Sequence, residues 1–66
     1  MRILVNGEAS DVQGARNVAE LVERLGMPSQ SILIEHNETA LHPREWRQRT
    51  LTEGDRIEIL RVVAGG

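Results

Sequence analysis

The chain of 66 residues has a formal net charge of −2, contains no cysteine, and has Trp46 as its sole aromatic residue. This length predicts one domain, near the lower limit for folding without disulfides or a structural metal. The absence of cysteine excludes disulfides and thiolate metal sites, and the charge and the scarcity of aromatic rings argue against nucleic-acid binding. No apolar run reaches the roughly 20 residues of a membrane span and no signal-peptide pattern is present, so we expect a monomeric cytoplasmic protein without membrane contacts.

The first twelve residues are typical of a β-hairpin. Residues 1–5 are rich in β-favouring side chains, and Asn6-Gly7 is the strongest short signal for a two-residue turn. Residues 8–12 can then return as an antiparallel strand. The side chains expected to pack on the core are Met1, Ile3, Val5, Ala9 and Val12.

A helix follows this hairpin. Asn17 predicts its start, because the side chain can cap free amide groups and Glu20 can reach back in a capping box. Side chains at i, i+3, i+4 and i+7 form one apolar stripe: Val18, Leu21, Val22 and Leu25. Gly26 favours a left-handed end of the helix, and Pro28 prevents its continuation.

Further short strands follow the helix. We expect strands at residues 31–36, at 39–41 and from 56 to about 63, with a short helical turn at 44–49 that packs Trp46 against the core. The turns between them are expected at Asn37-Glu38 and Glu53-Gly54-Asp55, and the inward residues are Ile32, Ile34, Ile57 and Ile59.

This element order predicts an α+β fold, with a mixed sheet of about five strands packed on one main helix. The topology is a β-grasp if the first and last strands pair in parallel at the centre of the sheet. We take residues 1–61 as the domain and residues 62–66 as a flexible C-terminal tail.

The sheet face away from the helix is predicted to carry apolar residues. Strand alternation assigns Leu4, Leu60 and Val62 to this face, and neighbouring strands are expected to gather Leu4 and Leu60 into one patch. An apolar patch rimmed by charge often marks a protein-binding site, although single exposed leucines are ordinary. The three arginines near Trp46 fit a solvated turn best, and an acidic partner or a phosphate is the alternative: Arg44, Arg47 and Arg49.

The last residues, Val62 to Gly66, carry the clearest functional signal. Arg61 breaks the inward alternation, so we expect the strand to leave the sheet there and the tail to project. Its predicted partner contacts are Val62, Val63, Ala64 and Gly65. Glycine has no Cβ, so such a tail can thread a narrow channel and deliver the α-carboxylate of Gly66, although a frayed end or a linker remnant is the alternative. We find no metal-ligand cluster and no internal catalytic constellation in the sequence, and His36 and His42 lack companion ligands.

The whole chain resembles the sulfur-carrier proteins of thiamine biosynthesis, the ThiS family. The resemblance rests on these segments: Ile3-Leu4-Val5-Asn6-Gly7, Val18-Ala19-Glu20-Leu21-Val22, Pro43-Arg44-Glu45 with Trp46, Glu53-Gly54-Asp55 and Val63-Ala64-Gly65-Gly66. The Gly-Gly end is shared with the molybdopterin-synthase small subunit and with ubiquitin, whereas the Pro-Arg-Glu motif with the following tryptophan favours the thiamine branch. His36 stands where the family usually has an apolar residue, and Thr39 is an extra residue near the third turn.

The resemblance implies a β-grasp sulfur carrier that is not itself an enzyme and binds no cofactor of its own. A ThiF-like adenylating enzyme would use ATP and Mg²⁺ to convert Gly66 into an acyl-adenylate. Sulfur from a partner's cysteine persulfide would then give a C-terminal thiocarboxylate, and a ThiG-like thiazole synthase would take that sulfur. Three alternatives remain at this point: a carrier for molybdopterin synthesis, a ubiquitin-like protein modifier, and a plain interaction module. The absence of lysine argues against chains of the protein itself.

Overall fold

The computed structural model describes residues 1–62. Its elements, in chain order, are β1 (Arg2–Val5), β2 (Glu8–Asp11), α1 (Val18–Leu25), the 3-10 turn η1 (Ser29–Ser31), β3 (Ile32–His36), β4 (Thr39–Leu41), the 3-10 turn η2 (Pro43–Gln48) and β5 (Arg56–Arg61). The elements occur in the predicted order. The last strand ends at Arg61, slightly earlier than expected.

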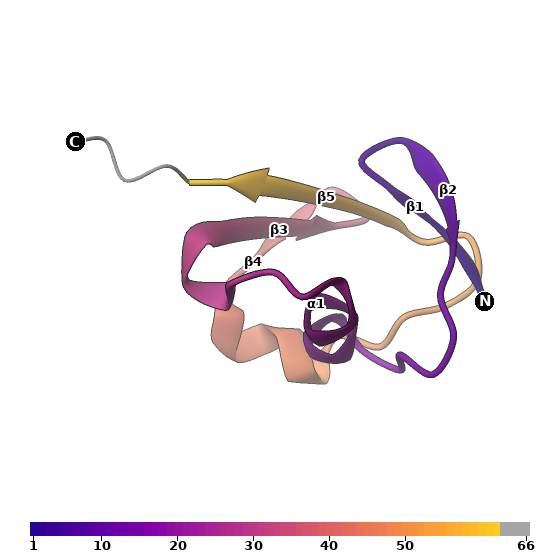
Figure 1. Ribbon diagram of the computed structural model, residues 1–66, viewed down its shortest axis with the longest axis horizontal. Coiled ribbons are helices and arrows are strands. Elements are labelled where there is room, and N and C mark those ends of the chain that lie inside the picture. The colour runs from indigo at the N-terminus through magenta and orange to yellow at the C-terminus, as the bar shows by residue number, and fades with distance from the viewer. Residues whose placement is uncertain (63–66) are drawn as a thin grey trace.

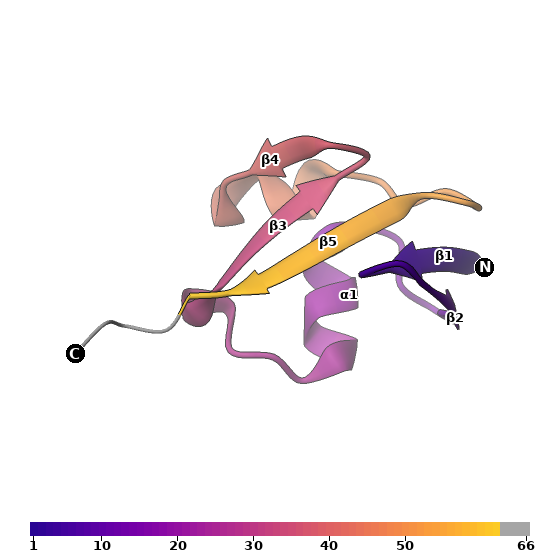
Figure 2. The ribbon, with the colours of Figure 1, turned by 90° about the horizontal axis from the view of Figure 1, so that it is seen from above.

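The five strands form one mixed sheet in the order β2-β1-β5-β3-β4. β1 and β5 lie side by side in parallel at its centre, and the other neighbouring strands are antiparallel. α1 and η2 both pack on one face of the sheet and leave the other face uncovered (Figure 1). Seen from above, β5 crosses in front of α1 (Figure 2). The predicted β-grasp arrangement is therefore confirmed.

The core lies between the sheet and the two helical segments. The least exposed large side chains are Ile3, Val18, Leu21, Ile34 and Ile57. Trp46 is also buried, as expected, and packs in this same cluster. The predicted inward faces of β1, β3 and β5 are thus confirmed.

Two predicted core positions are wrong. Ala9 is exposed because the hairpin register places it opposite Leu4, on the face away from the helix. Leu25 is 42% exposed, because it is the last residue of α1 and the chain turns away at Gly26. Val12, by contrast, does pack against the core.

The Asn6-Gly7 turn does more than reverse the chain. Both residues have positive φ, 50° and 83°, as a two-residue hairpin with primed geometry requires. The Asn6 side chain also accepts a hydrogen bond from the backbone N–H of Ile59 at 2.7 Å. This bond continues the pairing of β1 with β5 beyond the point where the hairpin leaves it.

The ends of α1 follow the sequence signals closely. The side chain of Asn17 caps the helix by accepting from the Glu20 N–H at 2.9 Å. The Glu20 carboxylate accepts from the Arg16 N–H at 2.7 Å, one residue before the expected partner. Gly26 ends the helix with a φ of 69°, as predicted.

Candidate functional site

The uncovered sheet face carries a pair of exposed leucines, Leu33 and Leu60, of which the sequence analysis predicts only Leu60. Leu60 in β5 lies directly opposite Leu33 in β3, and the two side chains are 56% and 54% exposed. Val62 continues the same face and is 49% exposed. Leu33 was missed, although its position between buried Ile32 and Ile34 signals an outward side chain, because its pairing with Leu60 depends on the strand register.

Leu4 lies apart from this pair. In the parallel pairing of β1 with β5 it stands opposite Arg56, four residues before Leu60. Four strand residues span about 13 Å, so the expected single patch of Leu4 and Leu60 is not formed. The two strands are neighbours as predicted, but the register separates the two leucines. Leu4 instead shares its part of the face with Ala9.

The end of β5 lies one residue before the last residue that the structure describes. Arg61 is the last residue of β5 and lies opposite Ile32, so the strand ends at the residue where its departure was expected. The N–H of Val62 donates to the carbonyl of Ser31 at 2.7 Å. The other predicted tail residues lie outside the described residues: Val63, Ala64, Gly65 and Gly66.

A buried polar cluster joins β3 to the turn before β5. Asp55 lies 2.7 Å from His36 Nε2, and it accepts further hydrogen bonds from Asn37 and from the N–H and hydroxyl of Thr52. Burial opposes the charge of Asp55, but these hydrogen bonds, with that from His36 the largest, hold its pKa well below the ordinary value. Asp55 is therefore ionised and a weak base, and its hydrogen bonds hold the end of β3 against the turn before β5.

Arg49 completes this cluster and settles the role of His36. Its Nε donates to His36 Nδ1 at 3.2 Å, and because a guanidinium can only donate, Nδ1 carries a lone pair. Nε2 then holds the ring proton and donates it to Asp55. Both ring nitrogens are occupied, so His36 is not placed to take a proton from a substrate. The sequence analysis treats His36 as a departure from the family pattern and as a histidine without companion ligands, and does not predict its partner Asp55, which lies 19 residues away.

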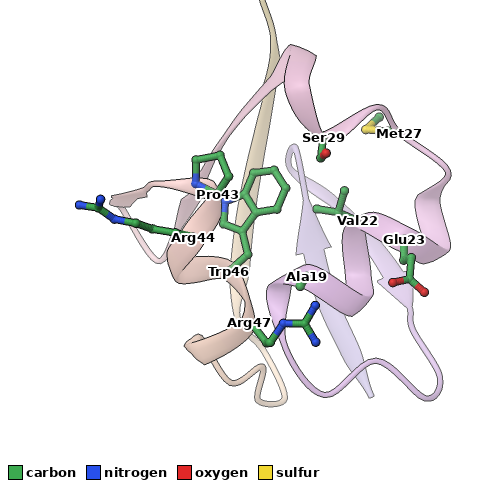
Figure 3. A pocket seen from close by; sticks show the side chains of 9 residues that line it. All are labelled: Ala19, Val22, Glu23, Met27, Ser29, Pro43, Arg44, Trp46 and Arg47. Atoms are coloured by element: carbon green, nitrogen blue, oxygen red, sulfur yellow. The ribbon is translucent and has the colours of Figure 1, made fainter.

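An open groove of about 400 Å³ lies between α1 and η2, beside Trp46. It is lined by Ala19, Val22, Glu23, Met27, Ser29, Pro43, Arg44, Trp46 and Arg47 (Figure 3). Arg44 extends away from α1. Charges of both signs line the groove, which does not favour a small anion as a ligand.

The Pro-Arg-Glu motif has a structural explanation in this region. Pro43 occupies the first position of η2, and the Glu45 carboxylate accepts from the His42 N–H at 2.7 Å. The motif therefore caps the turn that holds Trp46 in the core. Of the three arginines near Trp46, Arg49 points to His36 and only the other two line the groove.

Within residues 1–62, no three His, Asp or Glu side chains gather where they could hold a metal ion. In the same part of the chain, no helix has the length and apolar character needed to cross a membrane.

Comparison with known proteins gives consistent matches over the whole chain. The model of the ThiS family matches residues 3–66. The chain is 30% identical to the sulfur carrier protein ThiS of Escherichia coli K12, and each covers all of the other. It is 27% identical to a thiazole synthase of Paramagnetospirillum magneticum, of whose length it spans only 20%. A crystal structure of the thiamine biosynthesis protein ThiS from Geobacter metallireducens is 33% identical, with a TM-score of 0.85 and full coverage of both chains.

Proposed function

This chain belongs to the ThiS family, and on that basis we propose that it is a sulfur carrier for thiamine biosynthesis that works through the α-carboxylate of Gly66. The observation that carries the proposal is the family match, which extends to residue 66 and so includes the Gly-Gly pair. The described residues add indirect support, because their one buried acid–histidine pair is fully engaged in structural hydrogen bonds. The protein then acts as a co-substrate of other enzymes.

The proposed chemistry begins with a poor electrophile. A free α-carboxylate has a pKa near 3.5 and is ionised at neutral pH, so it must be activated before sulfur can be attached. A ThiF-like enzyme with ATP and Mg²⁺ would join the carboxylate to AMP and release pyrophosphate. The terminal sulfur of a cysteine persulfide would then attack the carbonyl and expel AMP, and a thiol would reduce the resulting disulfide to leave the thiocarboxylate. We expect these ATP-dependent steps in the cytoplasm.

A ThiG-like thiazole synthase is the proposed acceptor of the sulfur. The similarity of this chain to part of a protein named thiazole synthase supports this assignment. The proposed partner contacts are the exposed side chains of Leu60 and Val62, then Val63, Ala64 and Gly65, which lead to the reacting carboxylate. Leu4 remains a proposed contact at a separate point of the same face.

Intact mass spectrometry tests the proposal. The protein is co-expressed with its ThiF-like enzyme and a persulfide-forming desulfurase, and we expect one oxygen to be replaced by sulfur at Gly66. Addition of the thiazole synthase with its substrates should return the mass to that of the carboxylate. A variant lacking Gly66 is the control and should stay unmodified. Isopeptide conjugates would indicate a protein modifier, and a persistent unmodified carboxylate would contradict the carrier function.

A further inference from the structure

The pairing of β3 with β5 is only half formed at its last step. Ile32 lies opposite Arg61, so the next pair along the ladder is Ser31 with Val62. The N–H of Val62 donates to the carbonyl of Ser31 at 2.7 Å, and two residues paired in this way normally exchange a second bond in return. The N–H of Ser31 instead donates to the carbonyl of Pro28 at 3.1 Å. The ladder therefore lacks the donor that would hold the carbonyl of Val62.

This donor is taken by the 3-10 turn η1, which comes directly before β3. The bond from Ser31 back to Pro28 closes the turn, and proline is depleted in strands while serine is frequent in turns. Ser29 and Gln30 are exposed, so packing against the core does not impose their conformation. In both views the chain enters β3 at the end of the sheet where β5 ends (Figures 1 and 2). The local sequence thus places a turn where β5 would need a strand as its neighbour.

A longer β3 would change how much of the end of the chain is free. If β3 began at residue 29, residues 62–64 would pair with residues 29–31, and only Gly65 and Gly66 would remain beyond the ladder. An enzyme channel can surround only chain that is not hydrogen-bonded to a neighbouring strand. Four residues beyond Val62 can enter such a channel to a depth of at most about 14 Å, whereas two can enter to about 7 Å.

We propose that η1 is a positioning element: it stops the pairing of β5 at Val62 and so keeps the last four residues available to the adenylating enzyme. The inference rests on the proposed carrier function and adds the part of the domain that determines the usable length of the tail. That length matters because the α-carboxylate of Gly66 must reach ATP inside the enzyme, and misplacement by about 1 Å can cost about a hundredfold in rate. A tail paired with β3 would have to separate first, so only the separated fraction of molecules could bind.

The double variant Ser29→Val with Gln30→Val tests whether the sequence of η1 ends the ladder. Valine favours strands, so we expect β3 to begin earlier and the N–H of Ala64 to bond to the carbonyl of residue 29. Hydrogen exchange at the Ala64 amide should then slow at least about threefold, and the KM of the purified ThiF-like enzyme for the carrier should rise by a similar factor with kcat unchanged. The free energy of unfolding in urea should rise or stay unchanged, since both positions are exposed. Ser29→Ala with Gln30→Ala is the matched control, because alanine does not favour strands, and its KM should stay within about twofold of wild type.

A disulfide tests the length argument within one protein. Residues 30 and 63 would face each other in a continued ladder, at a non-hydrogen-bonded position with Cα atoms about 4.5 Å apart, which suits a disulfide. Wild type has no cysteine, so Gln30→Cys with Val63→Cys can form one intramolecular bond only. Oxidation leaves three residues beyond the bond and removes about 3.5 Å of usable length, so ATP–pyrophosphate exchange should fall at least about a hundredfold and return on reduction. Arg2→Cys with Asp11→Cys is the matched control: these residues are exposed and opposite each other in β1 and β2, and oxidation should change the rate by less than about twofold.

Restored length should rescue the oxidised protein. One valine inserted after position 63 leaves the sequence Val-Ala-Gly-Gly beyond the disulfide, as in the wild-type tail. Exchange should then return to within about threefold of the reduced protein although the disulfide stays in place. A disulfide that harmed the fold or blocked the enzyme in another way would not be relieved by the added residue.

The outcomes separate this inference from the proposed function. An unprotected Ala64 amide in the double valine variant would show that η1 does not end the ladder and would overturn the inference. Undiminished exchange in the oxidised disulfide variant, or no rescue by the inserted valine, would overturn the length argument, and each result leaves the carrier function intact. A wild-type protein that the enzyme failed to adenylate would overturn the carrier function, and this inference with it.

Discussion

Glu38 holds a backbone conformation that its side chain disfavours. It is the second residue of the two-residue turn between β3 and β4, and its φ of 74° lies in the left-handed region. The equivalent position of the first hairpin is Gly7, whose φ is 83°. Asparagine and glycine accept this conformation readily, whereas glutamate does so at a cost in energy.

Glu38→Gly should therefore stabilise the protein by about 0.5–1 kcal/mol, measured by urea unfolding. The lost ion pair with Arg56 is exposed and contributes little. The reciprocal change, Gly7→Ala, should destabilise by about 1 kcal/mol, although nothing lies within 4 Å of the added Cβ. A destabilised Glu38→Gly variant would show that the ion pair outweighs the backbone strain.

Asp55 should make stability depend on acid pH. Its pKa is held below the ordinary value in the folded state, mainly by His36, so the unfolded chain takes up a proton first as pH falls. The stabilisation is complete above about pH 5 and is lost progressively as the pH falls through the unfolded pKa of about 3.9 toward the lower pKa of the folded state. Asp55→Asn should cost about 2–3 kcal/mol at pH 7 because a charged hydrogen-bond acceptor is removed.

Urea unfolding of wild type and Asp55→Asn at pH 7, 5 and 3 checks this prediction. The difference between the two should narrow as pH falls, since protonation removes the same charge as the substitution. Asp11→Asn, at an exposed position of β2, should stay within about 0.5 kcal/mol of wild type. Parallel pH curves for wild type and Asp55→Asn would show that Asp55 does not supply the effect.

At the scale of elements, the Asn6 side chain connects the hairpin to β5. Asn6→Gly keeps the left-handed turn but removes the acceptor for the Ile59 N–H, so we expect a loss of about 1–2 kcal/mol in the free energy of unfolding. Asn6→Asp keeps an acceptor oxygen and should lose less. Hydrogen exchange at the Ile59 amide should accelerate in Asn6→Gly alone, and equal protection in both variants would contradict this role.

The extent of prediction from sequence also differs between kinds of element. The hairpin turn at Asn6-Gly7 and the two ends of α1 depend on residues that are adjacent in the chain. The local sequence was therefore sufficient to predict these features. The pairing of Leu33 with Leu60 depends on register between strands far apart in sequence, which no local pattern specifies. For the same reason Leu4 was predicted beside Leu60.

The buried cluster was missed for a related reason. His36 and Asp55 are 19 residues apart, and each alone reads as a strand end or a turn residue. Only the antiparallel pairing of β3 with β5 places the end of one strand beside the turn that precedes the other. A buried histidine at the end of an apolar strand was the available signal, since such a side chain needs a polar partner.

At the scale of the whole molecule, the domain and the proposed reacting group are separable. Within residues 1–62, the buried core includes no residue after Ile59, and β5 ends at Arg61. The sheet face that carries the proposed partner contacts is likewise part of the folded domain. Changes at Gly66 should therefore affect the reaction without affecting the fold.

Deletion of Gly66 tests this separation. It shortens the reach of the chain by about 3.5 Å, so the terminal carboxylate can no longer meet ATP in the activating enzyme. Since misplacement by about 1 Å can cost about a hundredfold in rate, adenylation measured by ATP–pyrophosphate exchange should fall at least that far. The free energy of unfolding should remain within about 0.5 kcal/mol of wild type.

In the same assay, Gly65→Ala tests the width of the entrance to the enzyme's active site without changing the length of the tail. It keeps the reach of the tail but adds a Cβ, so a narrow entrance to the active site should slow adenylation, whereas a wide entrance should not. Both variants should keep the stability of the wild-type domain. Unfolding of the Gly66 deletion would show that the end of the chain contributes to the core, and adenylation at the wild-type rate would remove Gly66 from the reaction.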